Sequence, residues 1–231
     1  MSEARVLILD GSIYPDLYHP TDHWRALIDG TPFDSIHLPS GQEIPDPGGY
    51  SHVILTGSEA SIMEPEAWHH VEAQAVRSAI DRGVPMLGSC FGHQMLAKTL
   101  SGPQHVRRTP TPELGWVSVD VFDDDPLFSG LKNPFGVFVS HFDEVIDPPA
   151  PWKIIAKSEQ CAVQVMRYGE KPVWGIQSHP EITPEDGILL LEGFIEKVPD
   201  KEDLLRDALA QTPRDDLLAR DIVRRFLDFR S

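Results

Sequence analysis

A cysteine set between two nearby glycines constrains the fold more than any other feature of the sequence. Residues 88–94 read GSCFGHQ. The apolar run 85–88 has the length of a buried strand, and residues 91–100 have the length of a helix. A small residue two positions before Cys90 and a glycine two positions after it permit a sharp strand-to-helix turn. This turn predicts a sheet whose strands lead directly into helices.

Apolar runs and helix-length segments alternate over the first part of the chain. The runs are short and end at turn residues, as buried strands do. The predicted strands are 5–9, 35–38, 52–56 and 85–88, the predicted helices are 24–28, 64–82 and 91–100, and residues 14–23 and 39–50 are predicted loops. Strands that alternate with helices imply a parallel sheet covered on both faces.

The pattern changes to strands after residue 102 and returns to helices near the end. The later predicted strands are 116–122, 135–139, 152–156, 162–168 and 173–177, and the later predicted helices are 184–197, 201–210 and 214–230. We therefore expect an α/β fold, an open and mainly parallel sheet with helices on both faces, added antiparallel strands and a helical C-terminus. Residues 1–197 would form one domain, and residues 198–231 a helical extension packed on it.

A second motif supplies the partners that a reactive cysteine needs. Residues 175–181 read GIQSHPE. Residues two apart on an extended chain point the same way, so His179 can face the thiol with Glu181 behind it. A helix N-terminus favours the thiolate of Cys90, a histidine moves the proton, and a carboxylate orients the histidine. Taken singly, the first motif also fits a buried cysteine in an ordinary turn, and the second fits a polar loop.

Together the two motifs resemble the class I, triad-type glutamine amidotransferase family, which pairs a G-x-C-x-G-x-Q elbow with a later H-P-E segment. Residues 56–61 (TGSEAS) resemble the glycine turn of that family, and residues 140–145 (SHFDEV) resemble its S-H-x-D segment. The resemblance covers most of residues 5–197. Within the family, the glutaminase domain of GMP synthase is the most similar in pattern.

The resemblance implies a flavodoxin-like fold and a role for each matching position. Cys90 would attack the side-chain amide carbon of glutamine or a γ-glutamyl compound, forming a γ-glutamyl thioester, with His179 as base and acid and Glu181 as its orienting carboxylate. The backbone amides of Gly57 and Phe91 would hold the oxyanion. The implied substrate-binding residues are Gln94, Ser140, His141 and Phe142. No cofactor is implied.

Three positions depart from the family pattern. Ser58 and Glu59 stand where the family usually has glycine and proline, and Ser178 stands where it often has phenylalanine. None of the three removes a catalytic group. We expect all three to change the rim of the pocket.

Charge and cysteine content limit the partners and the compartment. The chain has 231 residues and a net charge of −16, from 36 acidic and 20 basic residues. Such a charge disfavours nucleic acid and anionic membranes. Two cysteines cannot build a disulfide scaffold, and no apolar run has the length of a signal peptide core or a membrane span, so we expect a cytoplasmic protein. Cys161 is expected to be a structural thiol. The adjacent histidines 69 and 70 lack the spacing of metal ligands, and no metal is expected.

Three functions remain open at this stage. The first is a stand-alone hydrolase of glutamine or γ-glutamyl compounds, which the three departures favour. The second is a glutaminase subunit that delivers ammonia to a separate synthase chain, because no phosphate-binding Walker loop or synthase segment is present in this chain. The third is a catalytically silent glutamine-binding regulatory protein, which the intact cysteine, histidine and glutamate set disfavours.

Overall fold

The computed structural model describes residues 4–229 of the chain. Residues 1–3 and 230–231, which include the end of the predicted helix 214–230, lie outside the described residues. The helices are α1 (Pro20–Leu27), α2 (Ala67–Asp81), α3 (Phe91–Ser101), α4 (Pro184–Lys197), α5 (Glu202–Leu209) and α6 (Ala219–Asp228). The strands are β1 (Val6–Asp10), β2 (Phe33–His37), β3 (His52–Leu55), β4 (Met86–Ser89), β5 (Val106–Val121), β6 (Phe135–Val145), β7 (Trp152–Lys157), β8 (Val165–Tyr168) and β9 (Val173–Ile176).

The described residues form a 9-stranded sheet in the order β2-β1-β3-β4-β9-β8-β7-β5-β6. Strands β2, β1, β3, β4 and β9 pair in parallel. Strands β8, β7, β5 and β6 add antiparallel pairings beyond β9. The expected open α/β sheet with added antiparallel strands is confirmed. The last parallel strand, β9, also carries the chain toward the second motif.

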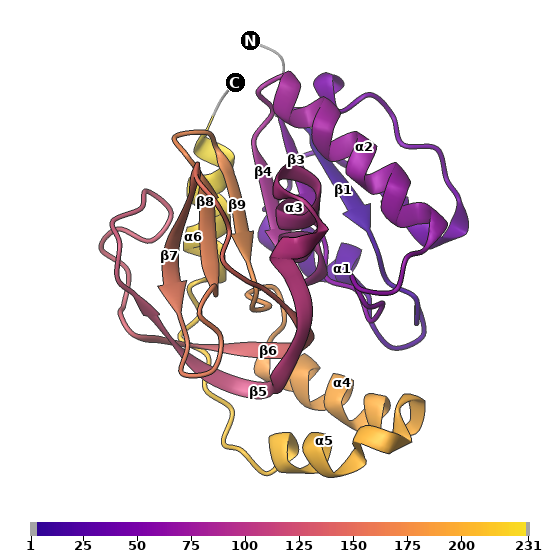
Figure 1. Ribbon diagram of the computed structural model, residues 1–231, viewed down its shortest axis with the longest axis vertical. Coiled ribbons are helices and arrows are strands. Elements are labelled where there is room, and N and C mark those ends of the chain that lie inside the picture. The colour runs from indigo at the N-terminus through magenta and orange to yellow at the C-terminus, as the bar shows by residue number, and fades with distance from the viewer. Residues whose placement is uncertain (1–3, 230–231) are drawn as a thin grey trace.

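The four inner parallel strands, β1, β3, β4 and β9, are buried on both faces, which requires a layer of helices on each side. Along β1, Leu7 and Leu9 pack in a core with residues of α2 and α3. Val6 and Ile8 point the other way, into a core with Trp24 of α1 and Phe226 of α6. Figure 1 shows α2 and α3 in front of the parallel strands and α6 behind β8 and β9.

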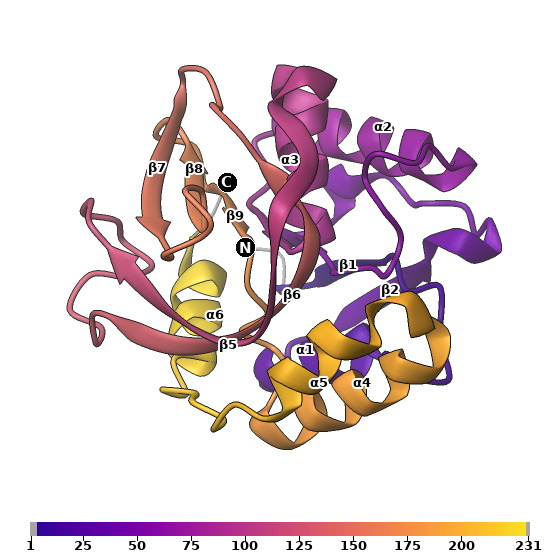
Figure 2. The same cartoon turned by 60° about the horizontal axis from the view of Figure 1, so that its bottom comes forward.

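Helices α4 and α5 form a third layer below the sheet. They lie side by side beneath β5 and β6 in Figure 2. Their apolar residues, including Leu190 and Leu205, share a small core with Tyr18 and Phe138. The division of the chain at residue 197 stays a prediction. Within residues 4–229, no helix combines the length and hydrophobicity that crossing a membrane requires.

Several predicted boundaries are wrong, for local physical reasons. Helix α1 begins at Pro20 inside the predicted loop, because proline suits the first turn of a helix. Strand β5 begins ten residues before its predicted start at 116, and β6 continues to Val145, so the S-H-x-D segment lies in a strand. Helix α6 begins at Ala219, and not at 214.

Candidate active site

The strand-to-helix turn places Cys90 in a strained backbone conformation. Cys90 has φ +47° and ψ −101°, between the end of β4 and the start of α3. A positive φ in a residue other than glycine costs on the order of 1–3 kcal/mol. A Cβ on Gly88 would lie 2.6 Å from the carbonyl carbon of Gly92, and a Cβ on Gly92 would lie 2.4 Å from the carbonyl oxygen of Leu55. Both glycines are therefore required by close backbone approach, and the turn is the sharp elbow that the motif predicts.

The sheet register brings the second motif to the same place. Strand β9 pairs with β4 so that Ile176 lies opposite Ser89, and the Cys90 amide donates to the Ile176 carbonyl at 2.8 Å. The chain then leaves the sheet, and the His179 amide donates to the Phe138 carbonyl of β6 at 2.9 Å. The His179 imidazole lies near enough to Cys90 for the charge of the sulfur to act on its pKa, and both side chains line the same cavity.

His179 and Glu181 form a buried pair. The Nδ1 atom of His179 lies 2.8 Å from Oε1 of Glu181, and both side chains are almost fully buried. Burial lowers the pKa of His179, but the negative charges of Cys90 and Glu181 and the hydrogen bond to Glu181 raise it to about 10. Burial raises the pKa of Glu181, but the charge and hydrogen bond of His179 outweigh burial and lower it. The site thus favours an imidazolium on His179, paired with the carboxylate of Glu181.

Two further side chains form hydrogen bonds with Glu181, and neither was predicted from the sequence. The hydroxyl of Tyr18 donates to Oε1 of Glu181 at 3.0 Å, and the hydroxyl of Ser89 donates to its carboxylate at 3.1–3.2 Å. Burial and the negative charge of Glu181 raise the pKa of Tyr18 well above its usual value. Ser89 lies in the elbow, directly before Cys90, and this position is the sequence signal that could have identified it. Tyr18 lies in a loop with no local signal.

The proposed oxyanion donors lie next to the reactive pair. A Cβ on Gly57 would lie 2.5 Å from Cε1 of His179, so the backbone of residue 57 passes directly against the imidazole. Phe91 is the first residue of α3, and amides in the first turn of a helix have no acceptor within the helix. Their assignment as an oxyanion hole stays a prediction.

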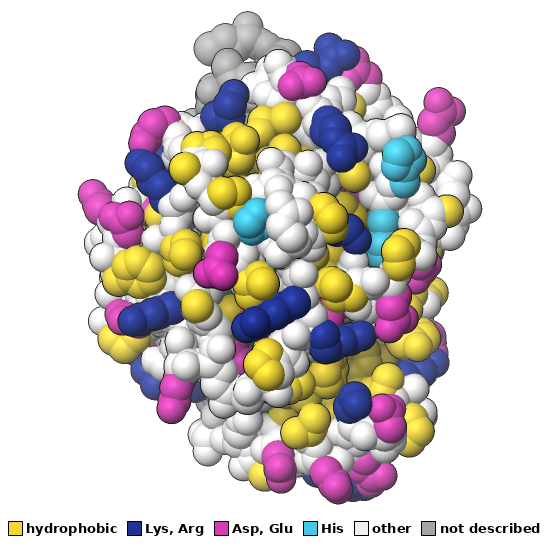
Figure 3. Space-filling view, viewed as in Figure 1, with side chains coloured by type: hydrophobic (Ala, Val, Ile, Leu, Met, Phe, Trp, Pro, Cys, Tyr) yellow, Lys and Arg dark blue, Asp and Glu magenta, His cyan; other side chains and the backbone are white. Residues whose placement is uncertain are grey.

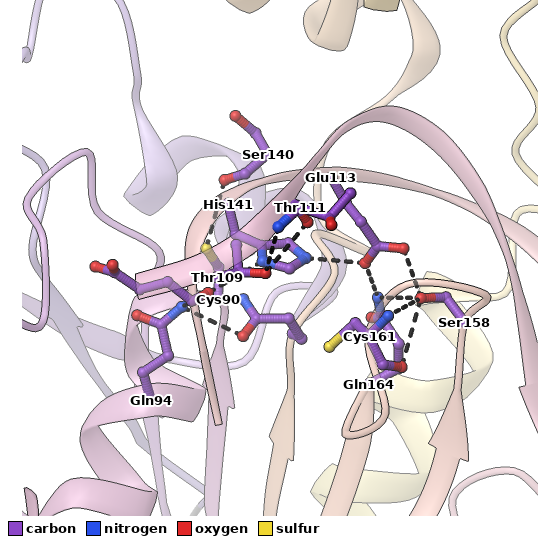
Figure 4. Close-up of polar contacts among 12 residues, drawn as sticks. Cys90, Gln94, Thr109, Thr111, Glu113, Ser140, His141, Ser158, Cys161 and Gln164 are labelled. Atoms are coloured by element: carbon purple, nitrogen blue, oxygen red, sulfur yellow. Dashed lines mark hydrogen bonds and ion pairs between the residues drawn. The ribbon is translucent and has the colours of Figure 1, made fainter. Parts of the chain in front are cut away.

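The proposed substrate-binding residues mostly form hydrogen bonds within the protein (Figure 4). The side-chain amide of Gln94 donates to the Asp143 carbonyl at 2.8 Å and to Oε1 of Gln177 at 3.2 Å, which leaves its own oxygen for a ligand. The Ser140 carbonyl accepts from the Cys90 thiol at 3.7 Å. The His141 ring is buried and points toward Glu113, so residue 141 can offer only its main chain to a substrate.

A second group of a glutamate, a histidine and a cysteine lies beside the site. Ligand-type atoms of Glu113, His141 and Cys161 all lie within 4.8 Å of one another. Donors from Ser158 at 2.6 Å and Gln164 at 2.7 Å already occupy both oxygens of Glu113. The group is therefore a hydrogen-bonded cluster that needs no metal to satisfy its carboxylate. Burial raises the pKa of the Cys161 thiol to about 12, which keeps this thiol protonated.

The reactive pair opens into a cavity of about 800 Å³. Figure 3 shows a hollow lined by hydrophobic side chains above the α4 and α5 layer, with charged side chains around it. Ser58 and Glu59 line the cavity as expected, but Ser178 is buried and does not, so that expectation is wrong for Ser178. The cavity is also lined by Glu64, Glu66, Arg108, Phe142, Asp143, Phe194, Val198, Asp200, Lys201 and Leu204.

Comparison with known protein families and sequences gives a consistent result. A family model described as glutamine amidotransferase class-I matches residues 40–198. The chain is 41% identical over 152 residues to a subunit of glutamine-hydrolysing GMP synthase from Sulfurisphaera tokodaii, a match that covers 64% of this chain and 76% of that protein. The corresponding protein of Sulfolobus acidocaldarius is 42% identical over 113 residues, which cover 48% of this chain and only 59% of the relative.

Solved structures match over nearly the whole chain. A glutamine amidotransferase from Thermotoga maritima superposes with a TM-score of 0.78 at 25% identity and covers 99% of this chain and 100% of its own. A glutamine amidotransferase from Methylobacillus flagellatus superposes with a TM-score of 0.76 at 20% identity and covers 99% and 96%. The second comparison concerns the fold alone. Both matches include the α4, α5 and α6 segments.

Proposed function

Because the chain belongs to the class I glutamine amidotransferase family, we propose that it hydrolyses the side-chain amide of glutamine through a γ-glutamyl thioester on Cys90. The family membership confirms the resemblance that the two motifs indicate. The observation that carries the proposal is the strained elbow, which presents Cys90 to His179 and Glu181 at the inner end of a cavity.

The reaction proceeds in two balanced steps. The Cys90 sulfur attacks the amide carbon, and the carbonyl oxygen becomes an oxyanion held by the amides of Gly57 and Phe91. As the carbon–nitrogen bond breaks, His179 gives its proton to the amide nitrogen, which leaves as ammonia, and a thioester remains on Cys90. His179 then removes a proton from water, whose oxygen attacks the thioester carbon. The carbon–sulfur bond breaks, glutamate leaves, and the thiolate and imidazolium are restored.

The α-amino and α-carboxylate groups of glutamine bind in a subsite of their own beside Cys90. The free side-chain oxygen of Gln94 accepts from the ammonium group, and the main chain of residues 140–142 completes this subsite. Asp143 shapes the subsite from behind, because its carboxylate accepts from the Ser61 hydroxyl at 2.6 Å and the Ile62 amide at 3.1 Å. The substrate is therefore held by the Gln94 side chain and by backbone groups, all on rigid elements.

The fate of the ammonia follows from the relatives. Relatives at 41–42% identity are subunits of GMP synthase, which supports delivery of ammonia to a synthase on a separate chain. The second candidate is a stand-alone γ-glutamyl hydrolase, which is supported by a cavity of about 800 Å³, far larger than glutamine needs. The silent binding protein has the least support, since the buried histidine and glutamate are aligned with a nucleophile.

The decisive experiment combines turnover with labelling of the thiols. The purified chain is incubated with glutamine while glutamate release is followed, and separately with an electrophilic glutamine analogue before mass mapping. We expect the label on Cys90 and none on Cys161, whose thiol stays protonated. Cys90→Ala should abolish glutamate release with an unchanged melting curve. Labelling without turnover would favour the partner-dependent subunit, and no labelling with no turnover would overturn the proposal.

A further inference from the structure

We propose that the outer part of the cavity binds the amine half of γ-glutamyl amides larger than glutamine, specifically amines with an apolar body that are neutral or positively charged. The inference rests on the proposed function, because it uses the same thioester chemistry at Cys90. It adds a leaving-group subsite formed by α4, α5 and the loop that follows β3.

The size of the cavity is the first observation. Glutamine has about ten non-hydrogen atoms, and even at the ~30 Å³ that a water molecule occupies in the liquid, it would fill about 300 Å³. The cavity has about 800 Å³, which lies in the range of pockets that hold considerably larger ligands, roughly 300–1,000 Å³. More than half of the space therefore lies beyond glutamine itself.

The wall of this extra space is apolar. Phe194 and Val198 of α4 and Leu204 of α5 line it, together with Phe142 of β6. Leu204 is 43% exposed, although it faces the cavity. Exposed apolar side chains that gather in a concave surface mark a binding site for an apolar group. Ammonia, the leaving group of glutamine, would make no use of such a wall.

The charges at the rim select against a negatively charged amine. Besides Asp143, whose buried carboxylate lies behind the amino-acid subsite, four carboxylates line the cavity, namely Glu59, Glu64, Glu66 and Asp200, against the two basic side chains of Arg108 and Lys201. Arg108 is already paired with Asp143 and Glu64 at 3.3 Å each, and Lys201 is paired with Asp200 at 3.0 Å. Within the described residues, no lysine or arginine lining the cavity is left for a ligand carboxylate, whereas carboxylates remain in excess.

The chemical step on such an amide balances as it does for glutamine. The Cys90 sulfur forms the thioester, the carbon–nitrogen bond breaks, and the proton of His179 goes to the nitrogen of the departing amine. The amine then leaves through the apolar space, and water enters to release glutamate. The subsite acts by binding the leaving group, so its effect appears in kcat/KM for the amide and is absent for glutamine.

A matched series of amides tests the inference. The purified chain is assayed with glutamine and with the γ-glutamyl amides of benzylamine, para-(aminomethyl)benzylamine and para-carboxybenzylamine. We expect kcat/KM for the first two amides to exceed that for glutamine by about 10-fold or more, and the carboxylate amide to fall about 10-fold below benzylamide. If turnover requires a partner chain, each compound is instead tested for how well it protects Cys90 from labelling by the electrophilic analogue. The compounds should then rank in the same order.

A pair of variants locates the subsite. Leu204→Asp should lower kcat/KM for the benzylamide at least 10-fold and leave glutamine hydrolysis unchanged. Leu189→Asp is the control, because Leu189 is 61% exposed on α4 and does not line the cavity. Leu204→Ala, which adds no charge, gives a second reading if the aspartate variant unfolds, with a smaller loss.

The outcomes separate the two proposals. Hydrolysis of glutamine with no preference for the apolar amides, or equal losses on glutamine and benzylamide in Leu204→Asp, overturns the subsite and leaves glutamine hydrolysis standing. An unlabelled Cys90 with no turnover of any substrate overturns the proposed function, and the subsite with it.

Discussion

Replacing Glu181 by glutamine removes one charge from the active site while keeping the shape of the side chain. Glu181 accepts from Nδ1 of His179 at 2.8 Å and from the hydroxyls of Tyr18 and Ser89. A glutamine oxygen can still accept from the histidine, and the serine hydroxyl can turn to accept from the new amide. The fold should therefore persist, and the loss should fall on the imidazolium that the proposed mechanism requires.

The size of the loss can be bounded from the geometry. Unit charges about 4 Å apart interact by about 4 kcal/mol at an effective dielectric constant of about 20. The surviving neutral hydrogen bond recovers part of this, since a hydrogen bond to a charged group contributes about 1.5–3 kcal/mol and a neutral one about half as much. We expect a net loss of about 2–4 kcal/mol in transition-state stabilisation, which corresponds to a roughly 30- to 1,000-fold lower kcat/KM.

The assay is the acylation rate in single turnover, measured with a γ-glutamyl anilide whose coloured amine is released in that step. His179→Ala should lose more than Glu181→Gln, because the histidine itself carries the proton. The high-pH limb of the profile, which follows the raised pKa of His179 near 10, should move to lower pH in the glutamine variant. Glu196→Gln, on the exposed side of α4, is the control. A loss below about 3-fold, or one larger than that of His179→Ala, would refute these roles.

Three further substitutions test buried groups in and outside the site. Tyr18→Phe removes one hydrogen bond to Glu181 and should lower kcat/KM about 5- to 30-fold with little change in melting temperature; an unchanged rate would contradict the positioning role. Glu72 is buried in α2, and burial raises its pKa from 4.5 to about 8, so the folded chain holds a proton that the unfolded chain releases and stability falls as the pH rises between these values. Between pH 4 and pH 9, the free energy of unfolding in urea should fall by about 5 kcal/mol more in the unmodified protein than in Glu72→Leu. A difference in unfolding free energy between the two proteins that does not change with pH would contradict this account. Glu113→Gln weakens its contact with His141 and should raise KM for glutamine more than it lowers kcat, whereas an equal loss of stability without a KM effect would indicate a purely structural cluster.

Local motifs predicted the reactive pair because their information lies within seven residues of sequence. The elbow at 88–94 and the segment 175–181 each carry their own turn and strand signals, and parallel pairing of β4 with β9 brings them together. The apolar runs likewise predicted the sheet. The first part of strand β5 was not predicted because Pro110 and Pro112 interrupt the strand pattern where its register shifts against β6.

The residues that support the site could not be found in this way. Tyr18 reaches Glu181 across 163 positions, and Glu113 reaches His141 across 28. Neither lies in a pattern that marks it, because only the closed fold brings these partners within hydrogen-bond distance. The helices α4 and α5 were predicted, but an apolar stripe on a helix does not say which surface it will face.

Because the backbone at Cys90 is strained, thermal stability and catalysis favour different residues at this position. Glycine adopts a positive φ at little cost, so Cys90→Gly would release strain on the order of 1–3 kcal/mol, partly offset by the greater freedom of glycine in the unfolded chain. A directed-evolution campaign that screened only for heat resistance would accept this change and discard the nucleophile. Any attempt to raise the thermal stability of this protein by selection must therefore also select for turnover at every round.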